Sequence, residues 1–269
     1  MYYQKEFAGA KGNSRKTWDI LRGVLKLGGR DSSTDIPSSI DYKGEVLVGE
    51  KIAEGFNKFF STVGYDLAKK IPNSKFRADS YLKGQVGRRF RFQEICSESI
   101  VWYSLQLKDK TSVGFDGVST RVVKRITPAV EKPLCHLFNL SLQTGFIPPE
   151  FKISRVIPLF KAGSKNDFGN YRPISIIPAF SKLFEMVLND QIRNYFNCFN
   201  LFSNSQFGFR KGSNPTLAVA KYLDAIFKKQ HDISLGVFID VKKAFDTVNH
   251  DILLRKLIII RLFATSCHT

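Results

Sequence analysis

The segment FIDVKKAFDTVNH, residues Phe238–His250, decides how the rest of the chain is interpreted. It places one carboxylate, Asp240, at the end of the apolar run Leu235–Ile239, and an aromatic residue, Phe245, five positions later. A nearly continuous apolar run of this length predicts a strand, Leu235–Val241, of the kind that is buried on both faces. Metal-dependent nucleotidyl transfer needs a fixed acid for Mg²⁺ beside a wall for the incoming sugar, and this segment offers both residue types.

Asp240 has two interpretations on the residues alone. A carboxylate at the end of a buried strand is costly unless it is paired or bound to a metal, which makes it a candidate metal ligand. The structural alternative is a cap on the following helix or an ion pair with Lys242 or Lys243. Only 29 residues follow Asp240, which leaves little sequence to supply further carboxylates.

The composition bounds the class of protein. The chain has 269 residues, 43% of them hydrophobic and 24 of them Phe, which is enough to fill a core. Its longest apolar runs are too short to cross a bilayer, and its first residues, MYYQKEF, carry charges where a signal peptide needs an apolar stretch. The four cysteines form no CxxC pair, which favours thiols in a reducing compartment. We expect an intracellular protein of the cytoplasm, the nucleus or both, with no membrane partner.

The charge favours a polyanionic partner. The formal net charge is +17, and residues 151–230 hold 12 Lys and Arg against 4 Asp and Glu, a net charge of +8. This excess overlaps aromatic and Gly-rich segments. Clustered Lys and Arg neutralise phosphates, so nucleic acid is the favoured partner over a merely solvated basic surface. Composition does not separate an enzyme from a binding module.

Periodicity and breaker residues predict a helical first half. Apolar residues recur at three- and four-residue steps, Ser119 or Thr120 is a candidate helix cap, and an apolar stripe (Val122, Leu134, Leu137, Leu140) is most simply core. A Gly- and Ser-rich stretch at 28–39 and a polar connection at 73–91 are expected to be irregular. The expected helices span residues 17–27, 45–71, 93–107, 119–126, 128–145, 179–196, 215–227 and 250–258.

A β-hairpin is expected between the two sets of helices. Ser154–Phe160 and Tyr171–Ile177 are short and β-prone, and the Pro inside the first suits an edge strand. The intervening KAGSKNDFGN is a loop by composition. This hairpin carries Lys161 on one arm and Arg172 on the other. Together these elements predict an α+β fold.

Three blocks of sequence, read in order, resemble one known family. They are VIPLFKAGSKNDFGNYRPISIIPAFSKLFEMVL, SQFGFRKGSNPTLAV and FIDVKKAFDTVNHDILLRKL. They are similar to the reverse transcriptase of jockey-like non-LTR retrotransposons. Further upstream, TSVGFDGVSTRVVKRI resembles the N-terminal extension to the fingers of that group, and KIAEGFNKFFSTVGYDLAKKI resembles the linker between its endonuclease and polymerase.

The resemblance implies roles for individual residues. Asp240 would be the first metal-binding carboxylate of the palm, with the backbone carbonyl of Val241 assisting it. Phe245 would exclude a ribose 2′-hydroxyl and so favour dNTPs. Lys161 and Arg172 would grip the triphosphate, the Lys as a point charge and the Arg as a fork. The candidates beside the template strand or the nascent base pair are Gln206, Gly208 and Arg210.

The resemblance also implies an architecture. Residues 1–90 would be a linker-like helical segment upstream of the polymerase, 91–232 the fingers region, and 233–269 the first palm strand and helix, with an incomplete palm sheet. The cofactor would be Mg²⁺, and the partners an RNA template, a DNA primer and dNTPs; the oligomeric state is not indicated.

The chain departs from the family pattern in one chemical respect. No Asp-Asp dipeptide occurs in the 269 residues, and the thumb that follows in the family is absent. We therefore expect a chain truncated after the first palm motif, with weak or no Mg²⁺ binding, no polymerase activity by itself, and a strand at 235–241 whose faces and edges are open. The alternatives are a non-catalytic RNA- or DNA-binding remnant and a relic without function.

Overall fold

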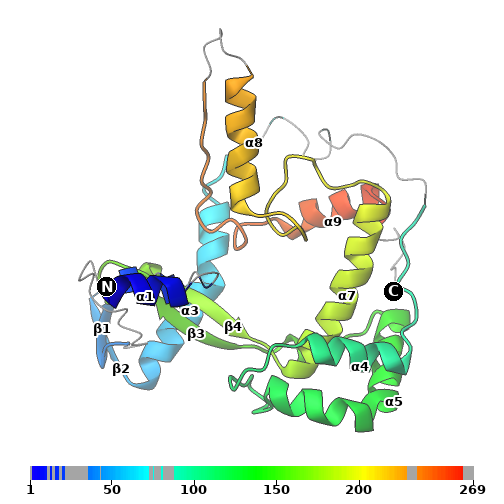
Figure 1. Cartoon of the computed structure of the whole chain (residues 1–269). Helices are drawn as coiled ribbons and strands as arrows, with labels where there is room; N and C mark the ends of the chain where they lie inside the picture. The colour runs from blue at the N-terminus through cyan, green and yellow to red at the C-terminus, as the bar shows by residue number, and fades with distance from the viewer. Residues whose placement is uncertain are drawn as a thin grey trace.

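A computed structural model describes residues 2–10, 13, 16–17, 20–21, 36–42, 44–72, 75, 80, 88–228 and 235–262. Most of the helix expected at 17–27 and of the irregular stretches at 28–39 and 73–91 lies outside these residues. The described part mixes helices with two antiparallel two-stranded sheets, which agrees with the α+β class (Figure 1). None of its helices is both long enough and apolar enough to cross a membrane.

The elements are as follows. The helices are α1 (Tyr2–Gly9), α3 (Glu50–Ala68), α4 (Ser97–Gln106), α5 (Thr120–Thr144), α6 (Pro149–Lys152), a 3-10 turn (Phe168–Asn170), α7 (Ala179–Cys198), α8 (Pro215–Phe227) and α9 (His250–Ile259). The strands are β1 (Ser39–Tyr42), β2 (Glu45–Val48), β3 (Arg155–Phe160) and β4 (Tyr171–Ile176).

The helix expected over 45–71 is shorter at its start. Residues 45–48 form β2, which pairs with β1, and α3 begins only after Gly49. Gly49 adopts a positive φ of 55°, a conformation that separates the strand from the helix and favours glycine. The apolar residues of β2 alternate in exposure, with Leu47 buried and Val48 exposed, so two-residue periodicity fits this segment better than the helical one.

The two helices expected over 119–145 are one helix, α5. Ser119 caps it by accepting a hydrogen bond from the amide of Val122, and Gly145 ends it in the left-handed conformation. Pro128 and Pro133 lie inside the helix on exposed positions, where water can satisfy the carbonyls that lose an amide partner. The apolar residues that α5 buries are therefore not the same set that the sequence predicted.

Because α5 is one unbroken helix, a single helical periodicity decides which of its residues are buried. The fully buried apolar residues are Val123 and Phe138, whereas Val122 and Leu140 are exposed, contrary to the prediction. Leu134 and Leu137 are partly buried, as expected for core. Phe138 packs with α4 and α7 in a helical core that includes Ile100 and Leu183. Val123 belongs to a smaller cluster with Leu107 and Ala179.

A second core joins α3, the β1–β2 sheet and the β3–β4 hairpin. Its buried members are Ile40, Leu47, Ile52, Phe56, Phe168 and Tyr171. The rings of Phe56 and Phe168 lie 4.4 Å apart between centroids, and those of Phe56 and Tyr171 lie 4.8 Å apart. The hairpin is thus held on α3 by aromatic packing.

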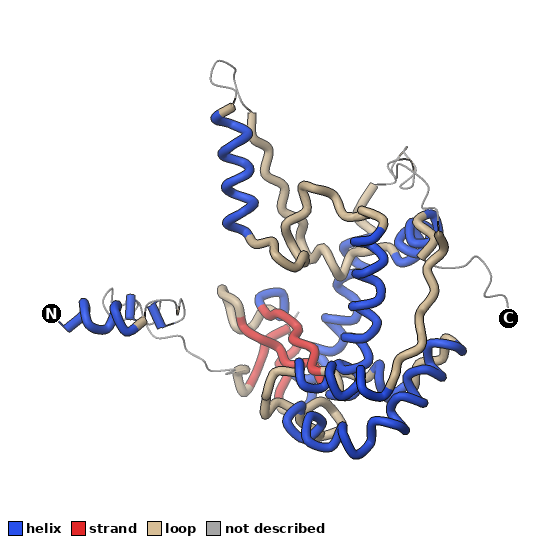
Figure 2. The backbone as a smooth tube through the Cα atoms, turned by 45° about the vertical axis from the view of Figure 1, so that its right-hand side comes forward, coloured by secondary structure: helices blue, strands red, loops and turns tan. Residues whose placement is uncertain are grey.

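The segment 235–240 is extended, but it is not a strand of a sheet. Among the described residues none pairs with it, and Leu235, Phe238 and Ile239 are all at least 84% exposed. A strand needs a hydrogen-bonded neighbour, so the prediction of a buried strand at 235–241 is wrong for the described residues. The segment runs beside α8 in both overall views (Figures 1 and 2), and the rings of Phe238 and Tyr222 lie 5.9 Å apart.

The last described residues pack against α7. Leu262 is buried against Tyr195, whose hydroxyl lies 2.8 Å from the Ile260 carbonyl and 2.9 Å from the Arg88 carbonyl. Burial raises the pKa of Tyr195, and Arg261 acts in the opposite direction. The residues after α9 therefore form part of the folded structure as far as position 262.

Candidate nucleotide and nucleic-acid site

The β3–β4 hairpin places Lys161 and Arg172 on one face. Leu159 pairs with Arg172 in the antiparallel register, and two pairs further along the Lys161 amide donates to the Asn170 carbonyl at 2.9 Å. Because directly opposed residues and residues two apart share a face, Lys161, Leu159 and Arg172 lie on the same side. Both cations are exposed. The hairpin prediction is confirmed, and it brings the two side chains to diagonal positions.

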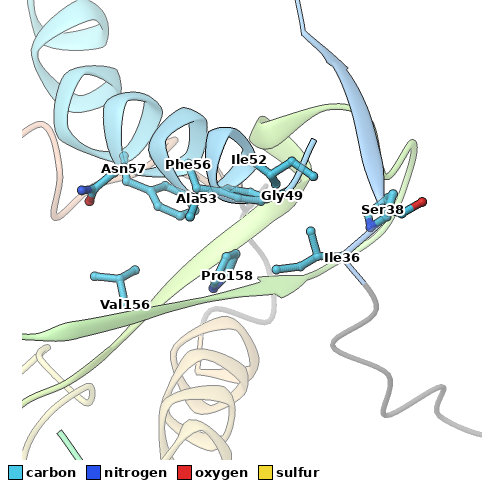
Figure 3. A pocket seen from close by; sticks show the side chains of 11 residues that line it. Ile36, Ser38, Gly49, Ile52, Ala53, Phe56, Asn57, Val156 and Pro158 are labelled. Carbon is cyan, nitrogen blue, oxygen red and sulfur yellow. The ribbon is translucent and has the colours of Figure 1, made fainter. Parts of the chain in front are cut away.

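The opposite face of the hairpin packs against α3. Phe160 and Tyr171 form the next pair, and Tyr171 is buried against α3. An apolar pocket of about 480 Å³ lies between this side of β3 and α3, with Val156 and Pro158 on one wall and Phe56 on the other (Figure 3). It therefore lies on the other side of the ribbon from Lys161 and Arg172.

The loop that joins the two strands is ordered by its own polar groups. The Asp167 carboxylate accepts the Gly169 amide at 2.7 Å, and the Asn170 side chain donates to the Ser164 carbonyl at 2.9 Å. The Tyr171 hydroxyl donates to the Lys165 carbonyl at 2.9 Å, and burial raises the pKa of that phenol. These bonds fix the shape of the loop beside the two cations.

The segment 203–211 is a second arrangement of cations and aromatic rings. The Arg210 guanidinium donates to the Ser203 carbonyl at 3.0 Å and lies 5.2 Å from the centre of the Phe202 ring. The Gln206 side chain donates to the Gly208 carbonyl at 3.4 Å. Gln206, Gly208 and Arg210 thus belong to one compact loop, as the sequence grouped them.

Phe245 lies against this loop. Its ring is 5.9 Å from that of Phe209, edge to face, and the two rings are 76% and 82% exposed. The structure therefore gathers the residue expected beside the dNTP sugar with the loop expected beside the template. Phe209 was not singled out from the sequence, because an isolated Phe in a Gly-rich loop gives no periodic signal.

Asp240 does not join the hairpin cations through any described interaction. It is exposed, and in the described part of the chain it makes no hydrogen bond or ion pair with Lys161, Arg172, Lys242 or Lys243. It is also not a helix cap, since Asn249 caps α9. The two structural alternatives for Asp240 are therefore not observed.

A metal site needs several ligand side chains close together. No group of three or more His, Cys, Asp and Glu side chains that could hold a metal ion occurs within the described ranges. Mg²⁺ is held by carboxylates together with substrate oxygens, and Asp240, with the adjacent Val241 carbonyl, belongs to no such group there. The role of Asp240 as an Mg²⁺ ligand therefore remains a prediction.

The matches to known proteins agree with these blocks. The family model for reverse transcriptase (RNA-dependent DNA polymerase) matches residues 163–266. This range contains Arg172, the 203–211 loop, Asp240 and Phe245. Over these residues the chain is similar to the reverse transcriptase family.

Curated proteins similar to this chain include two RNA-directed DNA polymerases of mobile elements and a protein of a retrotransposable element. The polymerase from mobile element jockey of Drosophila melanogaster is 26% identical over 213 residues, 77% of this chain and 22% of the relative. The probable polymerase from transposon BS is 30% identical over 162 residues (59% and 18%), and a putative 115 kDa protein of the type-1 retrotransposable element R1DM is 30% identical over 156 residues (56% and 15%), both in the same organism. The chain spans about a fifth or less of the length of these relatives.

Proposed function

We propose that this chain supplies the dNTP-gripping hairpin and the first palm segment of an enzyme that copies RNA into DNA. The single observation that supports this most is the shared face of Lys161 and Arg172, which offers a point charge and a planar fork toward one exposed side. Phosphoryl transfer depends mainly on positioning and charge stabilisation, so a basic hairpin is the expected means of holding a triphosphate.

Within this proposal each site residue has one role. Asp240 is the first palm carboxylate, with the Val241 carbonyl beside it, and Phe245 is the wall for the sugar. The loop carrying Gln206, Gly208 and Arg210 lies near the template strand or the nascent base pair. Reverse transcriptases use a divalent metal; Mg²⁺ would neutralise charge on the reacting phosphates.

We further propose that the 269 residues alone do not extend a primer. The donor set in the described residues is incomplete, and the sequence has no Asp-Asp dipeptide. The test is primer extension on an RNA template with dNTPs and Mg²⁺. Extension that Asp240→Asn abolishes would overturn this part of the proposal and would support the metal role of Asp240.

The second candidate function is non-catalytic binding of RNA or DNA. It is favoured by the net charge of +8 over residues 151–230 and needs no complete metal site. The test is the salt dependence of affinity for a labelled RNA, measured by fluorescence anisotropy. Lys161→Gln with Arg172→Gln should reduce the slope of log K against log salt by roughly 0.7–0.9 for each phosphate that is no longer neutralised.

A matched control separates a local effect from a general one. Lys132→Gln removes one exposed cation on α5, outside the hairpin. Its slope should change less than that of the double variant Lys161→Gln, Arg172→Gln. Two results would contradict a nucleic-acid site on the hairpin. One is an affinity that does not depend on salt, and the other is an equal effect of the hairpin variant and the α5 variant.

A further inference from the structure

Helix α3 contacts two separate parts of the proposed site. On one side, Phe56 packs on Phe168 and Tyr171 of the hairpin, at centroid distances of 4.4 and 4.8 Å. The approach is close at Gly55 also, where a Cβ atom would lie 2.8 Å from Cζ of Phe168. The position of the hairpin is therefore set by α3.

Further along α3, the same helix holds the turn that follows Asp240. The Lys243 ammonium lies 5.2 Å from the centre of the Phe59 ring and 5.9 Å from that of Phe60. One turn beyond, Gly64 is buried, and a Cβ atom there would meet the carbonyl oxygen of Asp246 and lie 2.9 Å from its carbonyl carbon. A cation–aromatic contact and a close backbone approach thus fix two points of the turn.

The turn has a defined shape between these two points. Lys243 adopts a φ of 50°, and its carbonyl accepts the amides of Asp246 at 3.0 Å and Thr247 at 3.2 Å. Lys243 is half-buried, whereas Phe245 is 76% exposed. The turn therefore leaves Phe245 exposed, while the Lys243 side chain and the Asp246 carbonyl face α3.

We propose that α3 fixes the hairpin and this turn relative to each other, with Phe59, Gly64 and Lys243 as positioning residues. This inference rests on the proposed function for its purpose, because only a nucleotide site needs the hairpin cations and the Asp240–Phe245 segment in register. Its geometry is independent of any nucleotide. It also supplies a mechanical reason for the segment 235–240 to keep its place without a neighbouring strand among the described residues.

Hydrogen exchange of the full chain without nucleotide tests the inference. Gly64→Ala should accelerate exchange of the Asp246 and Thr247 amides at least about threefold, because the added methyl displaces the turn. Alanine is intrinsically the better helix former, so a substitution that met no neighbour would leave the turn unchanged and stabilise α3. Unchanged exchange in the turn of Gly64→Ala would overturn the inference. Gly9→Ala in α1, whose added atom would meet nothing within 4 Å, is the control and should leave the turn unchanged.

A pair of Lys243 variants tests the charge without disturbing α3. Lys243→Met keeps an unbranched side chain one atom shorter and removes the cation, and it should accelerate exchange of the same two amides on the order of threefold. Lys243→Arg keeps a cation over the rings and should restore protection. If Met and Arg variants behaved alike, the cation would have no positioning role. Loss of RNA or dNTP affinity with these exchange results intact would count against the proposed function and not against the role of α3.

Discussion

Replacing Phe168 by alanine should detach the hairpin loop from α3 at a large cost in stability. The ring is fully buried, and its centroid lies 4.4 Å from that of Phe56 and 4.6 Å from that of Tyr42. Truncation of a buried Phe to Ala typically costs about 3–5 kcal/mol. Because Phe168 lies in a surface loop that can partly collapse into the space, we expect a cost at the lower end, about 3 kcal/mol.

The assay is urea unfolding followed by circular dichroism, with hydrogen exchange to locate the loss. The free energy of unfolding should fall by about 3 kcal/mol, and the amides of β3 and β4 should lose protection before those of α5. Phe209→Ala is the matched control: its ring is 82% exposed, so the change should stay within about 0.5 kcal/mol. A loss below about 1 kcal/mol for Phe168→Ala would refute the view that this ring fastens the hairpin.

Three further outcomes are expected. Ser119→Ala removes the cap of α5 and should cost about 1 kcal/mol in the same unfolding assay; no loss would mean that the cap bond is dispensable. Burial, together with the hydrogen bond to Asp190, raises the pKa of Tyr103 to about 12 from 10.0, so the folded state favours the protonated phenol. The stabilisation from the protonated Tyr103 phenol is complete below pH 10 and is lost as the pH rises to about 12. The wild type should therefore lose more stability over this window than Tyr103→Phe. Equal losses in the two proteins would contradict this role of Tyr103. Tyr195→Phe leaves two carbonyls without their hydroxyl partner and should cost about 1–2 kcal/mol by urea unfolding, with faster exchange in α9; a neutral effect would argue against this junction.

The sequence predicts the elements whose determinants are local. The hairpin arms, α7 and α8 follow from short β-prone runs, helical periodicity and the Asn214–Pro215 start of α8, and all three lie within a few residues of their expected positions. Segment 45–48 differs because its apolar residues also fit a helical repeat; pairing with β1, which is a non-local interaction, makes it a strand.

The environment in the folded protein also explains the remaining differences between the predicted and the observed elements. The prolines of α5 suggest two helices, but their exposed positions tolerate a missing amide. The run at 235–239 has strand composition, yet strand formation depends on a neighbour that the described residues do not provide.

The candidate site is predictable in parts and not as a whole. Lys161 and Arg172 share a face because the register of a hairpin follows from its pattern. The contact of Phe245 with Phe209 and the position of Lys243 over Phe59 join segments far apart in the chain, so no spacing rule could indicate them. The roles proposed for Asp240, Val241 and the 206–210 loop remain predictions.

The junction around Tyr195 has a consequence for the order of folding. Its hydroxyl joins carbonyls that lie 65 and 107 residues away in sequence, and the Phe90 amide donates to the Arg261 carbonyl at 2.8 Å. The hairpin and the α4–α5 pair, in contrast, close over short stretches of chain. Because distant contacts pay their loop-closure entropy before they gain any stability, the helices and the hairpin should assemble early. The junction of residues 88–90, 195 and 260–262 should form after them, and it should open before them when the protein is heated.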